Sequence, residues 1–185
     1  QYSWLKKQIA LPDTSYQDME RIISTIPIGS DGLRIIPFGN GAERMLGNAS
    51  PGARISNVQF NRHVRGHFYR AGLEGIAFSF VYGVQILKDL GMDIQVIKVG
   101  NDNLFQSKVF SATIANLLNC EIEVIQTTGA AGAAKASGLG IGWYNNLEEA
   151  INSNTVVKTY SPDASFALYH QAYQAWKNDL DQLLK

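Results

Sequence analysis

The fold of this chain is decided by residues 96–143, VIKVGNDNLFQSKVFSATIANLLNCEIEVIQTTGAAGAAKASGLGIGW. Residues 93–99 and 121–125 are predicted strands, and the segments 107–118 and 130–137 are predicted helices. Strands that alternate with helices of about ten residues imply right-handed crossovers and a parallel sheet covered by helices. Ligands of such sheets bind beyond the carboxyl ends of the strands, so both strand-to-helix turns are candidate ligand sites.

The first turn is formed by Gly100, Asn101, Asp102 and Asn103, and it leads to a helix whose first residues include Ser107. Gly100 lets the backbone come close to a ligand, and the following helix offers unpaired amide donors at its positive end. Such a turn can hold a nucleotide. The alternative is that glycine and asparagine only make the turn, because both tolerate positive backbone angles.

The second turn, TTGAAGAA over residues 127–134, has side chains so small that a ligand or another backbone could pack directly against it. The alternative is a helix crowded against the sheet or against another helix. Gly138, Gly140 and Gly142 follow a predicted helix rather than open one, so they indicate a helix stop and a turn instead of a dinucleotide-binding fingerprint. This argues against a dehydrogenase fragment, and no P-loop motif is present.

The rest of the chain predicts further helices and strands around this unit. Helices are expected over residues 15–26 and 62–90 and in a last helix that contains Tyr169 and Trp176, and strands over residues 33–38 and 54–60. The loop of residues 39–52 is long for a simple connection, and long ordered loops are often functional. We find no internal repeat and no second domain, so residues 1–185 are predicted to form one domain.

The composition excludes several classes of protein. Sixteen basic and sixteen acidic residues cancel without a basic stripe, which argues against nucleic-acid binding and favours a small ligand or a protein partner. The single Cys120 excludes an internal disulfide framework and a multi-cysteine zinc site, and a packed, inert thiol is expected. No apolar run reaches the roughly 20 residues of a membrane span, so a cytoplasmic protein without membrane contact is expected. The chain begins at Gln1 within an apparent helix, which suggests a piece of a longer protein.

Histidines and one charged pair complete the candidate residues. His63 and His67 lie four residues apart on a predicted helix, but without a third ligand nearby we expect a surface or helix-end role instead of a metal site. Arg70 and Glu74 lie one turn apart on the same helix and are expected to pair with each other.

Four blocks of sequence together resemble one known family. These blocks are IIPFGNGAERM, NRHVRGHFYRAGLEGIAFSF, VGNDNLFQSKVFSATIANLLNCEIEV and GAAGAAKASGLGIGWYNNLEEA. Their order and spacing over residues 33–150 are similar to the C-terminal domain of the FGGY carbohydrate kinases, and the nearest members are xylulokinases. The resemblance implies an α/β fold of the actin-like ATPase (ribonuclease H-like) type, with a mixed or parallel sheet flanked by helices.

The resemblance also implies a site. In this family two domains close like a clamp, with the sugar bound mainly to the first domain and magnesium ATP between the two. Gly100, Asn101, Asn103 and Ser107 would then border the adenosine. Gly39, Asn40 and Gly41 would line the nucleotide cleft, and Gly129 would approach the nucleotide. The sequence departs from the family at the adenosine turn, because typical members carry two or three successive glycines where this chain has Asn101 and Asp102.

What the chain lacks limits the function that the resemblance implies. The family's C-terminal domain opens with antiparallel strands and a Gly-Thr phosphate-binding turn, and its first domain carries the catalytic aspartate; neither is found in these 185 residues. We therefore expect the ATP-binding C-terminal part of a sugar kinase, acting on a ketopentose such as D-xylulose, with no catalytic or metal-binding residue of its own. It would pair with the N-terminal sugar-binding domain, and a homodimer is considered. Alone it is expected to be inactive. The alternative is a non-catalytic kinase-like module for binding or oligomerisation.

Overall fold

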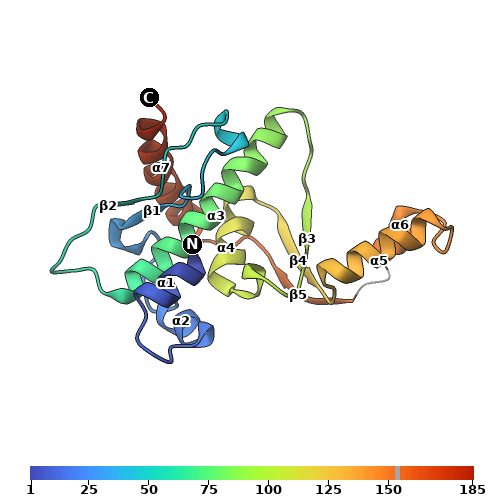
Figure 1. Ribbon diagram of the computed structural model, residues 1–185, viewed down its shortest axis with the longest axis horizontal. Coiled ribbons are helices and arrows are strands. Elements are labelled where there is room, and N and C mark those ends of the chain that lie inside the picture. The colour runs from blue at the N-terminus through green and yellow to red at the C-terminus, as the bar shows by residue number, and fades with distance from the viewer. Residues whose placement is uncertain (153–154) are drawn as a thin grey trace.

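The protein is described by a computed structural model that covers residues 1–152 and 155–185 (Figure 1). Its helices, strands and short 3-10 helices (η) are, in chain order, α1 (Tyr2–Gln8), α2 (Tyr16–Ile23), η1 (Ser30–Gly32), β1 (Arg34–Ile36), η2 (Arg44–Leu46), β2 (Arg54–Ser56), α3 (Arg65–Asp89), β3 (Val96–Gly100), η3 (Leu104–Gln106), α4 (Lys108–Leu118), β4 (Glu121–Ile125), α5 (Gly129–Gly140), α6 (Leu147–Asn152), β5 (Val156–Tyr160) and α7 (Phe166–Leu183). Among these residues no helix combines the length and apolar character needed to cross a membrane.

The sheet beside the long helix is mixed. β3 and β4 are parallel, with Val96 opposite Glu121 and Gly100 opposite Ile125, and α4 connects them as the sequence predicts. β5 then pairs antiparallel with β4. The sequence did not predict this third strand. Four of its five residues are exposed and only Tyr160 is buried, so the strand has no clear apolar face.

The helix α3 is the axis of the fold, and it contacts α1, α2, α4, α7 and β1. Leu73, Ala77 and Val84 of its predicted apolar stripe are buried, whereas Leu87 near its end is exposed. The helix begins three residues later than predicted. It is held close to β1 by Gly75, because a Cβ at that position would overlap the carbonyl oxygen of Ile35. Glycine is therefore what lets this strand cross the helix at short range.

The second, two-stranded sheet is formed by β1 and β2, which pair antiparallel. Both strands are shorter than predicted: β2 ends at Ser56, and Asn57 then takes a left-handed backbone angle of φ 60°. β1 and α7 together enclose a small core around Trp176, with Phe38 and Phe78 beside its ring. The larger core lies among α1, α2, α3, α4 and β4.

Cys120 belongs to the larger core and is 3% exposed. Burial raises the pKa of its thiol, and the charge of Lys88 opposes this only in part. The prediction of a packed thiol is confirmed.

The helices α5 and α6 form an arm that extends away from the body (Figure 1). α5 has no buried residue, so it is not crowded against the sheet, and the helix that it contacts is α6. Gly138 and Gly140 lie inside α5, which continues three residues beyond the predicted end. Gly142, with φ 76°, makes the turn that was expected after the helix.

Candidate functional site

The candidate site lies where β3 and β4 end side by side. Gly100 is the last residue of β3, and a Cβ on it would come within 3.0 Å of the carbonyl oxygen of Thr127, which follows β4. The absence of a side chain thus lets the two strand-to-helix turns approach each other. The structure brings the segment 100–107 and the segment 127–129 together at one edge of the sheet, as the parallel pairing predicts.

The turn after β3 is fixed by its own hydrogen bonds. The amide of Phe105 donates to the side-chain oxygen of Asn103 at 3.0 Å, and the side-chain amide of Gln106 donates to the carbonyl of Asn101 at 2.6 Å. Phe105 anchors the turn, because its ring meets that of Phe110 edge-on with 5.1 Å between ring centroids. A turn that is ordered before a ligand arrives costs less entropy on binding.

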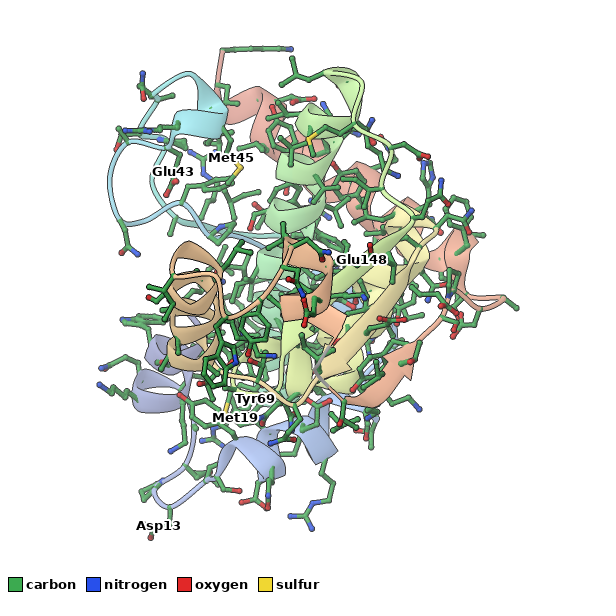
Figure 2. The ribbon with its side chains drawn as sticks, turned by 90° about the vertical axis from the view of Figure 1, so that its right-hand side faces the viewer. Asp13, Met19, Glu43, Met45, Tyr69 and Glu148 are labelled. Carbon is green, nitrogen blue, oxygen red and sulfur yellow. The ribbon has the colours of Figure 1, made fainter. Side chains whose placement is uncertain are left out.

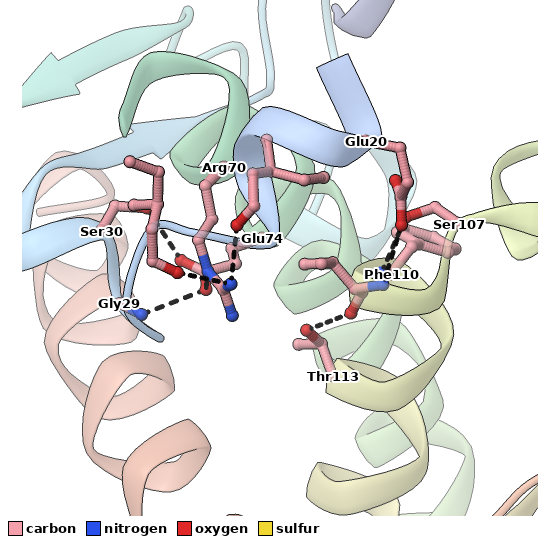
Figure 3. Close-up of polar contacts among 11 residues, drawn as sticks. Glu20, Gly29, Ser30, Arg70, Glu74, Ser107, Phe110 and Thr113 are labelled. Atoms are coloured by element: carbon pink, nitrogen blue, oxygen red, sulfur yellow. Dashed lines mark hydrogen bonds and ion pairs between the residues drawn. The ribbon is translucent and has the colours of Figure 1, made fainter. Parts of the chain in front are cut away.

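The start of α4 differs from the expectation. The amide of Phe110 donates to the hydroxyl of Ser107 at 3.2 Å, and the amide of Val109 donates to the carboxylate of Glu20 on α2 at 3.4 Å (Figure 3). The expectation of unpaired donors is therefore wrong for these two amides. Ser107 serves as the N-cap of α4, which is the local role that serine favours at a helix start.

The start of α5 is more open. The amide of Ala131 donates to the hydroxyl of Thr128 at 3.2 Å, so Thr128 is the N-cap of this helix. A Cβ on Gly129 would meet nothing within 4 Å. The positive end of a twelve-residue helix thus lies beside the end of β4 and is accessible.

A groove of about 270 Å³ lies between this sheet edge and the arm. Its lining is mainly apolar, with Ile125 from β4 and Leu139 and Leu147 from the arm. Thr127 and Lys98 add polar groups at its side. Concave, mainly apolar surfaces with a few polar groups are typical of sites for small molecules and cofactors.

The structure places Gly39, Asn40 and Gly41 elsewhere. They begin the loop between β1 and β2, in which Met45 approaches Gly83 in the last third of α3, with its sulfur 3.6 Å from a Cβ built on that glycine. Figure 2 shows Glu43 and Met45 of this loop at one end of the molecule.

The turn after β3 also contacts α3, because the ring of Phe105 meets that of Phe80 edge-on with 5.7 Å between ring centroids. Gly66, in the first turn of α3, packs against Ile22 of α2, and the neighbouring Glu20 reaches the start of α4. Figure 2 shows Met19 of α2 far from Glu43. The described hydrogen bonds and ring contacts do not join the residues 39–41 to the residues 100–107, and their place in a nucleotide cleft stays a prediction.

Arg70 and Glu74 form a buried pair, as predicted, with 2.7 Å between Nε and Oε1 (Figure 3). Glu74 also accepts hydrogen bonds from the amide of Gly29 at 3.1 Å and the hydroxyl of Ser30 at 3.2 Å. Burial raises the pKa of Glu74, and Arg70 opposes that rise most strongly. All these contacts tie α3 to the turn before β1, so the pair is part of the scaffold.

The two histidines are buried beneath the start of α3. The ring Nδ1 atoms of His63 and His67 accept the backbone amides of Gln59 at 3.0 Å and Val64 at 3.1 Å. Their Nε2 atoms must then carry the hydrogen, and they point to the carbonyl and the carboxylate of Asp31 at 3.3 and 3.1 Å. The prediction of a helix-end role is confirmed, while the surface location is wrong.

Metal ligation by these rings is disfavoured, because Nδ1 is engaged as an acceptor and Nε2 bears a hydrogen. In the segments that the structure describes, no group of three histidine, cysteine or carboxylate side chains could hold a metal ion.

Sequence reasoning missed part of the groove. It found the turn of residues 127–134, which contributes Thr127 and Gly132 to the lining. Lys98 and Leu147 give no signal in the sequence, because they reach the groove only through the pairing of β3 with β4 and the fold of the arm.

Comparison with known proteins adds to this geometry. Residues 36–140 match the model of the FGGY family of carbohydrate kinases, C-terminal domain. The chain is 26% identical over 197 residues to the xylulose kinase of Bacillus subtilis, covering 98% of this chain and 38% of that protein. It is 30% identical over 183 residues to the glycerol kinase of Shewanella piezotolerans, covering 94% and 35%. The chain thus spans little more than a third of the length of these relatives.

Solved structures show the same fold. The chain superposes on a ligand-bound xylulose kinase from Lactobacillus acidophilus with a TM-score of 0.82 at 21% identity, covering 98% of this chain and 37% of that one. For Plasmodium falciparum glycerol kinase with ADP the TM-score is 0.78 at 22% identity, covering 99% and 36%. At these identities the likeness concerns the fold, and the predicted fold class is confirmed.

Proposed function

Because the chain belongs to the FGGY family of carbohydrate kinases, we propose that it is the nucleotide-binding C-terminal part of a two-domain enzyme. That enzyme would transfer the γ-phosphate of ATP to a hydroxyl of a small sugar. The observation that carries the proposal is the pair of turns at the ends of β3 and β4, which meet beside an apolar groove.

The nucleotide would lie along this edge. We propose that Gly100, Asn101, Asn103 and Ser107 border the adenosine and that Gly129 approaches the nucleotide at the start of α5. The groove suits the flat, largely apolar base, whereas the side-chain oxygens of Asn103 and Ser107 hold their own backbone. These two residues would therefore shape the site by positioning the turn.

The substrate we propose is a ketopentose, with D-xylulose first. Xylulose kinases among the relatives and structures support this choice, but glycerol kinases and a gluconate kinase stand beside them. A polyol or a sugar acid is the competing class.

Phosphoryl transfer needs a metal ion, charge stabilisation and a carboxylate that accepts the hydroxyl proton. Magnesium bound with ATP would supply the positive charge on the phosphates. The described residues offer no cluster of ligands for it, so its protein ligands would come from the remaining part of the enzyme. For the same reason we propose that these 185 residues alone have no kinase activity.

The first experiment is a phosphorylation screen of the longer polypeptide with magnesium ATP and D-xylulose, L-xylulose, glycerol and gluconate. We expect the highest kcat/KM with a ketopentose, and the isolated chain should give no sugar-dependent ADP release. If the longer polypeptide phosphorylates none of these compounds, the proposed activity loses its support, and a non-catalytic role becomes the better explanation.

A second experiment tests the nucleotide site itself. Gly129→Asp introduces a negative charge where a Cβ has free space, and an acidic residue at a helix start is favourable for folding. ATP affinity of the longer polypeptide should fall at least about tenfold, which corresponds to about 1.4 kcal/mol. Gly140→Asp is the matched control, because it adds the same charge at an equally open position about 16 Å further along α5. Equal affinities for the two variants would count against the site.

A further inference from the structure

Asn40 and Gly41 form the one Asn-Gly pair in the sequence, and both residues are exposed in the loop between β1 and β2. A glycine leaves the backbone unusually free, because it has no Cβ and adopts angles that other residues avoid. Gly41 has φ 112°, and a Cβ built on it would meet nothing within 4 Å. The space beside the peptide that follows Asn40 is therefore open.

Hydrogen bonds hold the loop on both sides of this pair. The amide of Gly39 donates to the carbonyl of Pro37 at 2.8 Å, and the amide of Glu43 donates to the carbonyl of Ala49 at 2.9 Å. Among the described hydrogen bonds, none uses the side-chain amide of Asn40 or the backbone amide of Gly41. These two groups are adjacent, and no bond has to break before they can react with each other.

We propose that Asn40 is a site of spontaneous deamidation, with Gly41 as the internal nucleophile. The backbone nitrogen of Gly41 loses its proton and attacks the side-chain carbonyl carbon Cγ of Asn40. A C–N bond forms and closes a succinimide ring, and the side-chain nitrogen leaves as ammonia together with that proton. Water then opens the ring at either carbonyl carbon and gives aspartate or isoaspartate. The reaction consumes water and needs no enzyme, oxidant or reductant.

Asp31 and Gly32 form the one Asp-Gly pair in the sequence, which is capable of the same ring closure with loss of water. Here the fold holds both reacting groups. The amide of Gly32 donates to the carbonyl of Gly29 at 2.8 Å, and the carboxylate of Asp31 accepts from Nε2 of His67 at 3.1 Å. The geometry therefore protects this pair and leaves the pair at Asn40 reactive.

Deamidation gives position 40 a negative charge that asparagine lacks. The segment 39–41 is predicted to line the nucleotide cleft, and a carboxylate in that cleft repels the phosphates of ATP. The reaction would then lower the ATP affinity of the longer polypeptide as the protein ages. This effect rests on the proposed function, whereas the reaction at Asn40 does not.

Peptide mapping by mass spectrometry tests the reaction in the chain, which is incubated at about pH 8 in native buffer and in guanidinium chloride. Asn40 should convert in native buffer within about threefold of its rate in the unfolded chain, because no local opening has to come first. Isoaspartate at Asp31 should form at least about 100-fold more slowly in native buffer than in the unfolded chain. If the fold slows the reaction at Asn40 as much as it slows the reaction at Asp31, the proposal is overturned.

Two variants of the same loop supply the control. Asn40→Asp should remove most of the ammonia that the folded chain releases. Asn48→Asp should leave that release unchanged, because Asn48 is also exposed but is followed by alanine. Equal ammonia release from both variants would assign the reaction to another asparagine and overturn the proposal.

The same variants in the longer polypeptide test the effect on the nucleotide. Asn40→Asp should weaken ATP binding at least about threefold at low salt, and the difference should shrink as salt screens the added charge. Asn48→Asp adds the same charge and should weaken binding less. Equal ATP affinities for the two variants would refute this effect. If no form of the longer polypeptide binds ATP, the proposed function fails with it, while peptide mapping still decides the reaction at Asn40.

Discussion

Replacing Gly75 by alanine should separate β1 from α3. A Cβ at this position would overlap the carbonyl oxygen of Ile35 and lie 3.3 Å from its carbonyl carbon. The same oxygen accepts a hydrogen bond of 3.0 Å from the indole nitrogen of Trp176 on α7. The strand cannot move away from the helix without loosening this buried contact, because helix, strand and α7 meet at one atom.

The expected cost follows from these contacts. Forcing a methyl group into a packed core costs about 1–3 kcal/mol, and an unsatisfied buried indole N–H costs about 1–3 kcal/mol. Alanine regains about 1 kcal/mol over glycine inside a helix. The free energy of unfolding should therefore fall by about 3 kcal/mol. At a urea dependence of about 2 kcal/mol per M, the midpoint moves down by about 1.5 M.

Urea unfolding of the chain, followed by circular dichroism and tryptophan fluorescence, measures this shift. Gly83→Ala is the matched control on the same helix, because its Cβ would meet the sulfur of Met45 at an ordinary 3.6 Å. The free energy of unfolding of this control variant should rise by about 0.5–1 kcal/mol. If Gly75→Ala is as stable as the unmodified chain, or shifts in the same direction as the control, the close approach of β1 to α3 is refuted.

Three further predictions concern buried or capping groups. Glu74→Leu should destabilise the chain by about 3–5 kcal/mol by leaving Arg70 buried without its partner. Arg70→Met combined with Glu74→Leu should lower the free energy of unfolding by less than Glu74→Leu alone. An equal or larger decrease in the same urea assay would contradict a coupled pair. Tyr2→Phe should raise the free energy of unfolding by about 1 kcal/mol, because the Tyr2 hydroxyl is buried without a partner among the described residues; a loss of stability would show a hidden partner. Hydrogen bonds from Ser15, helped by Arg21, lower the pKa of the Asp18 carboxyl group. The Asp18 carboxylate therefore stabilises the fold fully well above pH 3.8, and this stabilisation is lost as the pH falls through the lowered pKa. Asp18→Asn should flatten this acid limb of the urea midpoint, and an unchanged pH profile would exclude the effect.

The sequence predicted the parallel pair because its signals are local. Residues 93–99 and 121–125 are short segments with apolar residues between polar ones, bounded by turn residues, and α4 between them has a defined start and end. The chain connectivity then requires a right-handed crossover and places both carboxyl ends at one edge. The turn after β3 was therefore found as a candidate site, and its Gly100 has the close backbone contact that the pattern suggests.

The features that the sequence did not predict depend on distant partners. β5 has its register set by β4, more than 30 residues earlier, and its own residues are mostly exposed. Glu20 caps the start of α4 across 89 residues, which no local pattern reveals. The burial of His63 and His67 likewise depends on Asp31 and its left-handed backbone angle of φ 51°. Contacts of this kind arise only after the helices have packed.

Local and distant contacts together would let the proposed half of a nucleotide cleft keep its shape. Glu20 holds the start of α4, Phe105 anchors the turn to the core, and Asn103 caps its short helix, all without help from a nucleotide. The groove beside them is mainly apolar, so it favours a base over a charged phosphate chain. Binding of the base would then align the phosphates toward the rest of the enzyme, where the proton acceptor and metal ligands are proposed to lie. Sugar selectivity and nucleotide affinity should accordingly respond to different sets of mutations. Mutations at the carboxyl ends of β3 and β4 should change the KM for ATP and leave the order of preferred sugars unaltered.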